Sequence, residues 1–167
     1  MFNYYLLLGS NLGNRNEYLE KAKVDLKTHF INIIQKSSIY ETEAWGNPEA
    51  EKQNPHLNQV IYITCHHRPE TLLNIIQAIE NNHGRRRFHK WGARTLDIDI
   101  LYHQDRIIST SRLTIPHPEI PNRRFALVPL VEIAPHLKHP ILDLDQTALL
   151  NFCSDPLEVK EWSINTH

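Results

Sequence analysis

The sequence predicts an α+β fold of the ferredoxin-like type, a β-α-β-β-α-β sandwich with an antiparallel sheet and an additional C-terminal hairpin and helices. The first observation is the order of the apolar patterns, which read strand, helix, strand, strand, helix, strand along the chain. The second is that two successive strands have no helix between them, which disfavours a doubly wound parallel sheet. Such a fold places both main helices on one face of the sheet and leaves the other face to loops.

The elements of the first half are bounded by residues that favour starts and stops. They are, in order, a strand over 4–8, a helix over 14–29, a strand over 31–40, a loop over 41–55 and a strand over 58–64. The first strand ends at Gly9, and Asn14 with Glu17 three residues on resembles a capping box that begins the helix. We expect the strand over 31–40 to be irregular in its middle. The polar loop that follows carries Trp45, and loops of such length are often functional.

The second half follows the same logic. Its expected elements are a helix over 69–83, a basic loop over 84–93, a strand that ends at 102, a hairpin around 105–106, a proline-rich loop and helices over 125–133 and 147–152. Pro69 suits the first position of a helix, and Leu72, Ile76 and Ile79 form its apolar stripe. Residues 107–108 would be the return strand of the hairpin.

The composition limits the classes of protein to which the chain can belong. The chain has 167 residues, 41% hydrophobic and 22% charged, which predicts a single domain over residues 1–167 with a buried core. A net charge of −1 offers no general attraction to nucleic acid or membrane. Cys65 and Cys153 are too few for a disulfide scaffold. We expect a cytoplasmic monomer with one activity, and neither a nucleic-acid nor a membrane partner.

The candidate metal-binding and phosphate-binding residues are concentrated between residues 84 and 101, where a basic segment precedes Asp97 and Asp99 on an expected strand. Residues two apart on a strand point to the same face, so the two carboxylates lie together while Ile98 points into an apolar layer. Two such carboxylates repel each other unless a cation separates them. Mg²⁺ uses one or two carboxylates and completes its shell with water and phosphate oxygens. A solvated strand face is the alternative.

The basic segment offers charges that could hold a polyphosphate. They are Arg85, Arg86, Arg87, Lys90 and Arg94. Arginine forks match phosphate oxygens, which together with the carboxylates suggests phosphoryl-type transfer. An RNA-binding patch with Phe88 and Trp91 as stacking platforms is a second hypothesis, although no extended basic surface accompanies it. The eleven histidines are scattered, which favours surface residues over a zinc site.

Three aromatic residues lie in expected loops or at the edges of elements, namely Trp45, Trp91 and Phe125. Any one of them is more often part of a core. Their position beside charged loops makes a stacking site for a flat ring worth testing.

Four motifs resemble those of one family over nearly the whole chain. They are LGSNLGN at 8–14, SSIYET at 37–42, GRRRFHKWGARTLDIDIL at 84–101 and RLTIPHPEIPNRRFALVPL at 112–130. The chain is similar to the 6-hydroxymethyl-7,8-dihydropterin pyrophosphokinases of folate biosynthesis. The resemblance implies a ferredoxin-like fold and the transfer of diphosphate from ATP to the hydroxymethyl group of a reduced pterin, with release of AMP.

The resemblance also implies roles for individual residues. Asp97 and Asp99 match carboxylates that hold two Mg²⁺ ions, and Arg85 and Arg94 match catalytic arginines. The positions that match the ATP side are Gln77, Glu80, Arg87, Ile98, Arg112, Thr114, His117 and Arg123. Those that match the pterin side are Thr42, Trp45, Asn58, Trp91, Asp97 and Phe125.

The chain departs from the family pattern at a few positions. Glu43 and Ala44 stand where proline often follows the threonine, His56 stands where tyrosine is frequent, and Pro118 follows His117 where an aromatic residue is common. These differences lie at the pocket edge and the adenine side, and none involves the carboxylates. We expect no side-chain general base, and we expect ATP to bind before the pterin.

Overall fold

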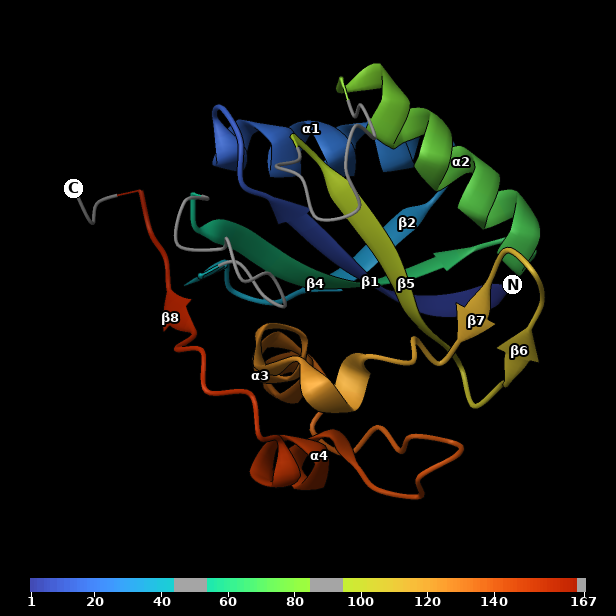
Figure 1. Cartoon of the computed structure of the whole chain (residues 1–167). Coiled ribbons are helices and arrows are strands. Elements are labelled where there is room, and N and C mark those ends of the chain that lie inside the picture. Colours follow the sequence, from blue (N-terminus) through green and yellow to red (C-terminus); the bar gives the residue numbers. More distant parts are fainter. Residues whose placement is uncertain (44–53, 85–94, 165–167) are drawn as a thin grey trace.

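The computed structural model describes residues 1–43, 54–84 and 95–164 of the chain. A central sheet separates two helical layers, with α1 (Arg15–Thr28) and α2 (Pro69–Asn82) on one face and α3 (Arg124–Ile133) and α4 (Gln146–Phe152) on the other (Figure 1). The two faces bury separate apolar clusters. The prediction of both main helices on one face is therefore confirmed, but the opposite face carries helices as well as loops.

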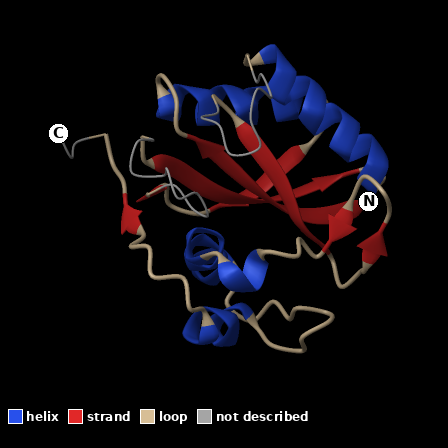
Figure 2. Cartoon of the chain, in the orientation of Figure 1, coloured by secondary structure: helices blue, strands red, loops and turns tan. Residues whose placement is uncertain are grey.

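The sheet is antiparallel throughout, as predicted. Its strands are β1 (Phe2–Ser10), β2 (Asn32–Lys36), β3 (Tyr40–Thr42), β4 (His56–Cys65), β5 (Asp97–His103) and β8 (Lys160–Glu161). They lie in the order β5-β1-β4-β3-β8, and β2 also pairs with β4. Figure 2 shows the strands in red with the blue helices on both sides of the sheet. The central position of β1 and β4 explains why their side chains are buried on both faces.

The helix α1 begins where the sequence predicted. The Oδ1 atom of Asn14 accepts a hydrogen bond from the backbone N–H of Glu17 at 3.2 Å, which satisfies one of the free donors of the first turn. The capping box is only half formed, because the carboxylate of Glu17 instead pairs with Lys21 at 2.6 Å. Leu19, Ala22 and Leu26 then pack against the sheet.

The expected strand over 31–40 is two strands, β2 and β3, joined by residues 37–39. Ser37 keeps this interruption attached to β4: its N–H donates to the carbonyl of Val60 at 2.9 Å, and its Oγ accepts from the N–H of Val60 at 3.0 Å. The following residues, Glu41 and Thr42, belong to β3 rather than to the long loop that the polar sequence predicted.

The hairpin predicted around 105–106 is wrong in its pairing. The short strand β6 (Ile108–Ser109) pairs with β7 (Thr114–Ile115) in a separate sheet rather than returning along β5. The N–H of Thr110 donates to the carbonyl of Leu113 at 2.9 Å and closes the turn between β6 and β7. A short 3-10 helix, η2 (Ile120–Asn122), then leads into α3.

The C-terminal tail passes from one face of the sheet to the other. It leaves α4, pairs with β3 through β8, and places Trp162 against the apolar cluster beneath α1 and α2. The sequence predicted no element here. Among the described residues, no helix has the length and apolar character needed to cross a membrane.

Candidate active site

The pairing register places a row of site residues across four adjacent strands, on the face that α3 covers. Gly9 of β1 lies opposite Asp97 of β5 on one side and opposite Asn58 of β4 on the other. Asn58 in turn lies opposite Tyr40 of β3. The sequence predicted Asp97 and Asn58 as site residues, and the sheet brings them to either side of one glycine.

Gly9 separates the two polar side chains without adding one of its own. A Cβ atom at this position would lie 3.0 Å from Oδ1 of Asn58, a distance that real Cβ atoms essentially never undercut. With strands about 4.8 Å apart, Asp97 and Asn58 are separated by roughly 10 Å. The result is a flat backbone floor between a carboxylate and an amide, on which a flat polar ring could rest. The sequence offered one indication, since a glycine inside a strand often marks close approach of a ligand.

Thr42 and Asn58 form the amide side of this floor. Both are buried, with 3% and 4% of their surface exposed, and Nδ2 of Asn58 donates to Oγ1 of Thr42 at 3.3 Å. This contact orients the Asn58 amide. A buried amide and hydroxyl can recognise the N–H and C=O groups at the edge of a heterocycle.

Asp97 and Asp99 project from the same face of β5, as the sequence predicted. Their neighbours Ile98 and Ile100 are buried in the cluster on the opposite face. Two half-exposed carboxylates form an oxygen donor set that fits Mg²⁺, which takes its remaining ligands from water and phosphate. Among the described residues, no group of three or more acidic, histidine or cysteine side chains forms a fuller metal cage.

Arg123 joins the carboxylates to α3. Its side chain is 17% exposed, and its Nη1 atom lies 3.8 Å from Oδ2 of Asp99. The same guanidinium lies over the ring of Phe125, 5.7 Å from the centroid. Phe125 itself is partly buried against the cluster on the α3 face. A cation and a ring, both near the N-terminal end of α3, thus accompany the carboxylates.

His117 is held neutral beside this group. Burial, the positive charge of Arg123 and weaker opposing effects of Glu119 and Asp97 lower the pKa of His117 to about 4. Its Nδ1 atom accepts from the backbone N–H of Glu119 at 3.2 Å, so the proton lies on Nε2. A neutral imidazole with one N–H donor can bind a ligand acceptor without adding positive charge.

A second group of predicted residues connects α2 with the turn before β7. Nη2 of Arg112 donates to Oε1 of Gln77 at 3.4 Å and to Oδ1 of Asn74 at 2.7 Å. Glu80 lies one turn beyond Gln77 and is 2% exposed, while Thr114 is exposed on β7. The side chain of Ile98 lies in the core, so its main chain is what remains to contact a ligand.

Several predicted residues lie outside the described part of the chain. They are Trp45, Arg85, Arg87, Trp91 and Arg94. The residues that flank the basic segment are described: Oγ1 of Thr95 donates to the carbonyl of His83 at 2.6 Å. This hydrogen bond holds the end of α2 beside the start of β5.

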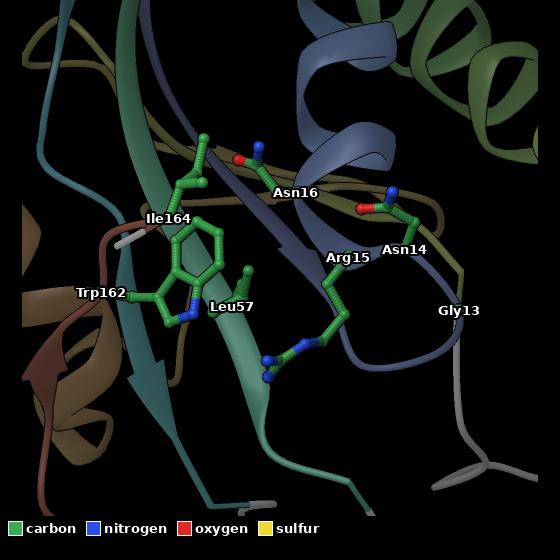
Figure 3. Close-up of a pocket in the computed structure, with 7 residues that line it drawn as sticks. All are labelled: Gly13, Asn14, Arg15, Asn16, Leu57, Trp162 and Ile164. Atoms are coloured by element: carbon green, nitrogen blue, oxygen red, sulfur yellow. The ribbon is translucent and has the colours of Figure 1, made fainter. Parts of the chain in front are cut away.

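Two cavities lie away from the row. One, of about 400 Å³, is lined by Arg15, Leu57 and Trp162 near the start of α1, and the Arg15 side chain extends toward the indole (Figure 3). The other, of about 510 Å³, is lined by Arg68, His103 and Arg106 at the opposite end of the sheet. Neither is lined by Asp97, Asp99 or Asn58.

The fold is shared with solved structures of one class of enzyme domain. Plasmodium falciparum HPPK-DHPS A437G aligns with a TM-score of 0.69 and 16% identity over 90% of this chain. An HPPK-DHPS solved in complex with substrates aligns with a TM-score of 0.68. This chain spans only 43% to 45% of the length of those two chains. At such low identity the likeness confirms the ferredoxin-like fold.

Sequence comparison identifies the family. The model of the 7,8-dihydro-6-hydroxymethylpterin-pyrophosphokinase (HPPK) family matches residues 5–135. A 2-amino-4-hydroxy-6-hydroxymethyldihydropteridine pyrophosphokinase of Aquifex aeolicus is 41% identical over 84% of this chain and 86% of its own length. The Bacillus subtilis protein of that name is 42% identical over 77% of this chain and 76% of its own length. The chain belongs to the HPPK family.

Proposed function

We propose that this protein transfers diphosphate from ATP to the hydroxymethyl group of 6-hydroxymethyl-7,8-dihydropterin, in tetrahydrofolate biosynthesis. The products are the pterin diphosphate and AMP. The observation that carries the proposal is the family match over residues 5–135, together with relatives about 40% identical over most of their length that are named pyrophosphokinases. Because ATP is an abundant cytoplasmic metabolite, we place the protein in the cytoplasm, and we propose a monomer.

The row across the sheet supports binding of the pterin. A flat bicyclic ring can lie on the Gly9 floor, with Asn58 and Thr42 on its polar edge and the hydroxymethyl group toward Asp97. Phe125 offers an aromatic face for stacking, which favours a planar ligand. Trp45 and Trp91 are proposed as further pterin contacts.

Asp97 and Asp99 are proposed to hold two Mg²⁺ ions. Such ions would neutralise phosphate charge and would make the hydroxymethyl proton easier to lose. The carboxylates orient the reacting groups, and Arg123, 3.8 Å from Asp99, limits their repulsion. We assign no side-chain general base.

The bond changes are those of an in-line displacement. The pterin hydroxymethyl oxygen bonds to the β-phosphorus of ATP, the bond from that phosphorus to the oxygen of the α-phosphate breaks, and the hydroxyl proton passes to solvent. Positive groups around the phosphates stabilise the charge that shifts onto AMP. We propose that one set of residues contacts the phosphates and the nucleotide of ATP. The set consists of Arg85, Arg94, Arg87, Arg112, His117, Gln77, Glu80, Ile98, Thr114 and Arg123.

The test is the formation of AMP from ATP and Mg²⁺, with and without 6-hydroxymethyl-7,8-dihydropterin. We expect AMP to appear only when the pterin is present, in a ratio of one to the pterin diphosphate. Formation of AMP or ADP at equal rates without the pterin would contradict the proposal. A simple pterin without the hydroxyl group is the matched control, because it can occupy the floor but offers no attacking oxygen.

A further inference from the structure

Glu132 makes hydrogen bonds that helix formation does not require. It lies one residue before the end of α3, where the negative end of the helix dipole disfavours a carboxylate. Its Oε1 atom accepts from the N–H and the Oγ of Ser38, each at 2.9 Å. Its Oε2 atom accepts from the hydroxyl of Tyr40 at 2.5 Å. One carboxylate therefore accepts from three donors, two on Ser38 in the segment that joins β2 to β3 and one on Tyr40 at the start of β3.

Tyr40 is a protonated donor in this link. Burial, the hydrogen bond to Glu132 and nearby negative charges raise its pKa further above the ordinary tyrosine value. Hydrogen bonds to a charged acceptor are about twice as strong as neutral ones. The link between α3 and β3 is thus a set of charge-assisted bonds.

Tyr40 belongs to the row that forms the floor of the site. It lies opposite Asn58, and Thr42, which bonds the Asn58 amide, is two residues further along β3. The other end of α3 carries Arg123 and Phe125, beside Asp99. The helix is therefore fixed to β5 at its start and to β3 at its end.

We propose that Glu132 is a positioning residue for the pterin pocket. By bonding Ser38 and Tyr40 it sets the distance between the amide side of the pocket, Asn58 and Thr42, and the stacking ring of Phe125. This inference rests on the proposed function and adds a residue that contacts neither substrate. It predicts a larger effect on the pterin than on ATP. Most of the proposed ATP side lies on α2, β7 and β5, and its contact with α3 is Arg123, at the end of the helix far from Glu132.

The experiment compares Glu132→Ala and Glu132→Gln in the full chain. Removing the carboxylate should raise KM for the pterin by about tenfold, the scale of one charge-assisted hydrogen bond, with kcat and the KM for ATP changed less than about twofold. Glutamine keeps an acceptor for Ser38, so Glu132→Gln should restore much of the pterin KM. Equal changes in both KM values, or none in either, would overturn the proposal.

A matched control separates positioning from general loss of stability. Asp145 caps α4, which packs on α3, by accepting from the N–H of Ala148 at 2.8 Å, and it makes no bond to β3. Asp145→Ala should lower Tm to a similar degree and leave the pterin KM unchanged. If Asp145→Ala raises that KM as much as Glu132→Ala does, Glu132 is a structural residue only.

Milder variants keep the proposal testable if Glu132→Ala folds poorly. Tyr40→Phe removes one hydroxyl from the link and should raise the pterin KM in the same direction by a smaller factor. In the Glu132→Gln background, Tyr40→Phe should raise the pterin KM by a smaller factor than it does in the wild-type protein, because the two groups form one link. Full additivity would contradict the link.

The outcomes also distinguish this inference from the proposed function. A wild-type protein that forms no AMP with the pterin present overturns both. An active wild type whose Glu132→Ala variant keeps a normal pterin KM overturns the positioning role and leaves the proposed function standing.

Discussion

At the scale of single residues, the site depends on the absence of a side chain at Gly9 as much as on the side chains of Asn58 and Asp97. Its missing side chain lets the Asn58 amide lie against β1, with a hypothetical Cβ only 3.0 Å from Oδ1. Asp97 occupies the position opposite Gly9 on the other side. The spacing of the carboxylate and the amide is therefore set by backbone register, which is more rigid than side-chain packing.

The carboxylates give the first prediction. Asp97→Asn and Asp99→Asn should each lower kcat by on the order of a hundredfold or more, because an amide cannot supply the charge that binds Mg²⁺. AMP formation measured over a Mg²⁺ series checks this. Asp105→Asn, an exposed carboxylate in the turn after β5, is the control and should behave as wild type. Near-normal turnover in both site variants would remove the metal assignment.

His117 gives a prediction about pH. Its pKa of about 4 is below the value of about 6.5 expected in the unfolded chain, so between these values the unfolded state binds a proton that the folded state does not. Stability should therefore fall as pH decreases from about 6.5 to about 4, with His117 contributing roughly 2 to 3 kcal/mol. Unfolding in denaturant, without Mg²⁺ or nucleotide, measures it.

His117→Gln should flatten this dependence, because glutamine can still accept from the N–H of Glu119 but does not titrate. Burial also lowers the pKa of His103 and His139, so part of the slope should remain. The exposed His136 supplies the control variant, His136→Gln, with an unchanged slope. A His117→Gln curve parallel to wild type would contradict the assignment.

At the scale of elements, the interruption between β2 and β3 is a structured feature of the sheet. Gln59 donates to the carbonyl of Ser37 at 2.7 Å, and Gln59 in turn accepts from the buried Lys23 at 2.9 Å. Ser37 thus attaches the segment to β4 on the side of α1, and Ser38 attaches it to α3. The strand can change direction here without leaving its backbone groups unbonded.

Ser37→Ala should therefore destabilise the fold by about 1 to 3 kcal/mol, the cost of leaving the buried N–H of Val60 without its acceptor. Chemical denaturation followed by circular dichroism measures the change. Ser111→Ala, at an exposed position, should change stability by less than about 0.5 kcal/mol. Equal effects of the two substitutions would show that the Ser37 hydroxyl contributes little.

At the scale of the whole molecule, the C-terminal tail connects the two helical layers. Asp155 accepts from the N–H of Arg124 at the start of α3, at 3.0 Å, on one face. Beyond it, the N–H of Trp162 donates to the carbonyl of Ile39 at 2.8 Å, and the indole packs on the cluster of the other face. The tail therefore passes around the edge of the sheet and contacts both faces.

Trp162→Ala should lower the free energy of unfolding by about 1 to 2 kcal/mol, because a half-buried indole contributes less than the roughly 3 to 5 kcal/mol of a buried one. Thermal and denaturant unfolding should agree on the loss. Phe152→Ala, which removes an aromatic side chain that is 77% exposed, is the control and should cost little. A Trp162→Ala protein as stable as wild type would mean that the tail is only loosely attached.

The sequence predicted the main elements because their patterns are local. The cap at Asn14, the proline that begins α2 and the alternation of Asp97, Ile98 and Asp99 each act over a few residues. The row through Gly9 could not be predicted, because it depends on the register of distant strands. The β6–β7 pairing and β8 were missed for the same reason, since two-residue strands carry no periodicity.

The two-sided burial of β1 has a consequence for motion. Leu6 and Leu8 face one apolar cluster and Leu7 faces the other, while β4 and β5 bond both edges of the strand. The amide protons of these three leucines should exchange with deuterium only when the whole molecule unfolds. Those of β6 and β7, which pair over two residues each, should exchange through local opening. The strand that carries the Gly9 floor would then be among the slowest-exchanging parts of the protein. Any adjustment to a ligand would have to come from the segments around this strand.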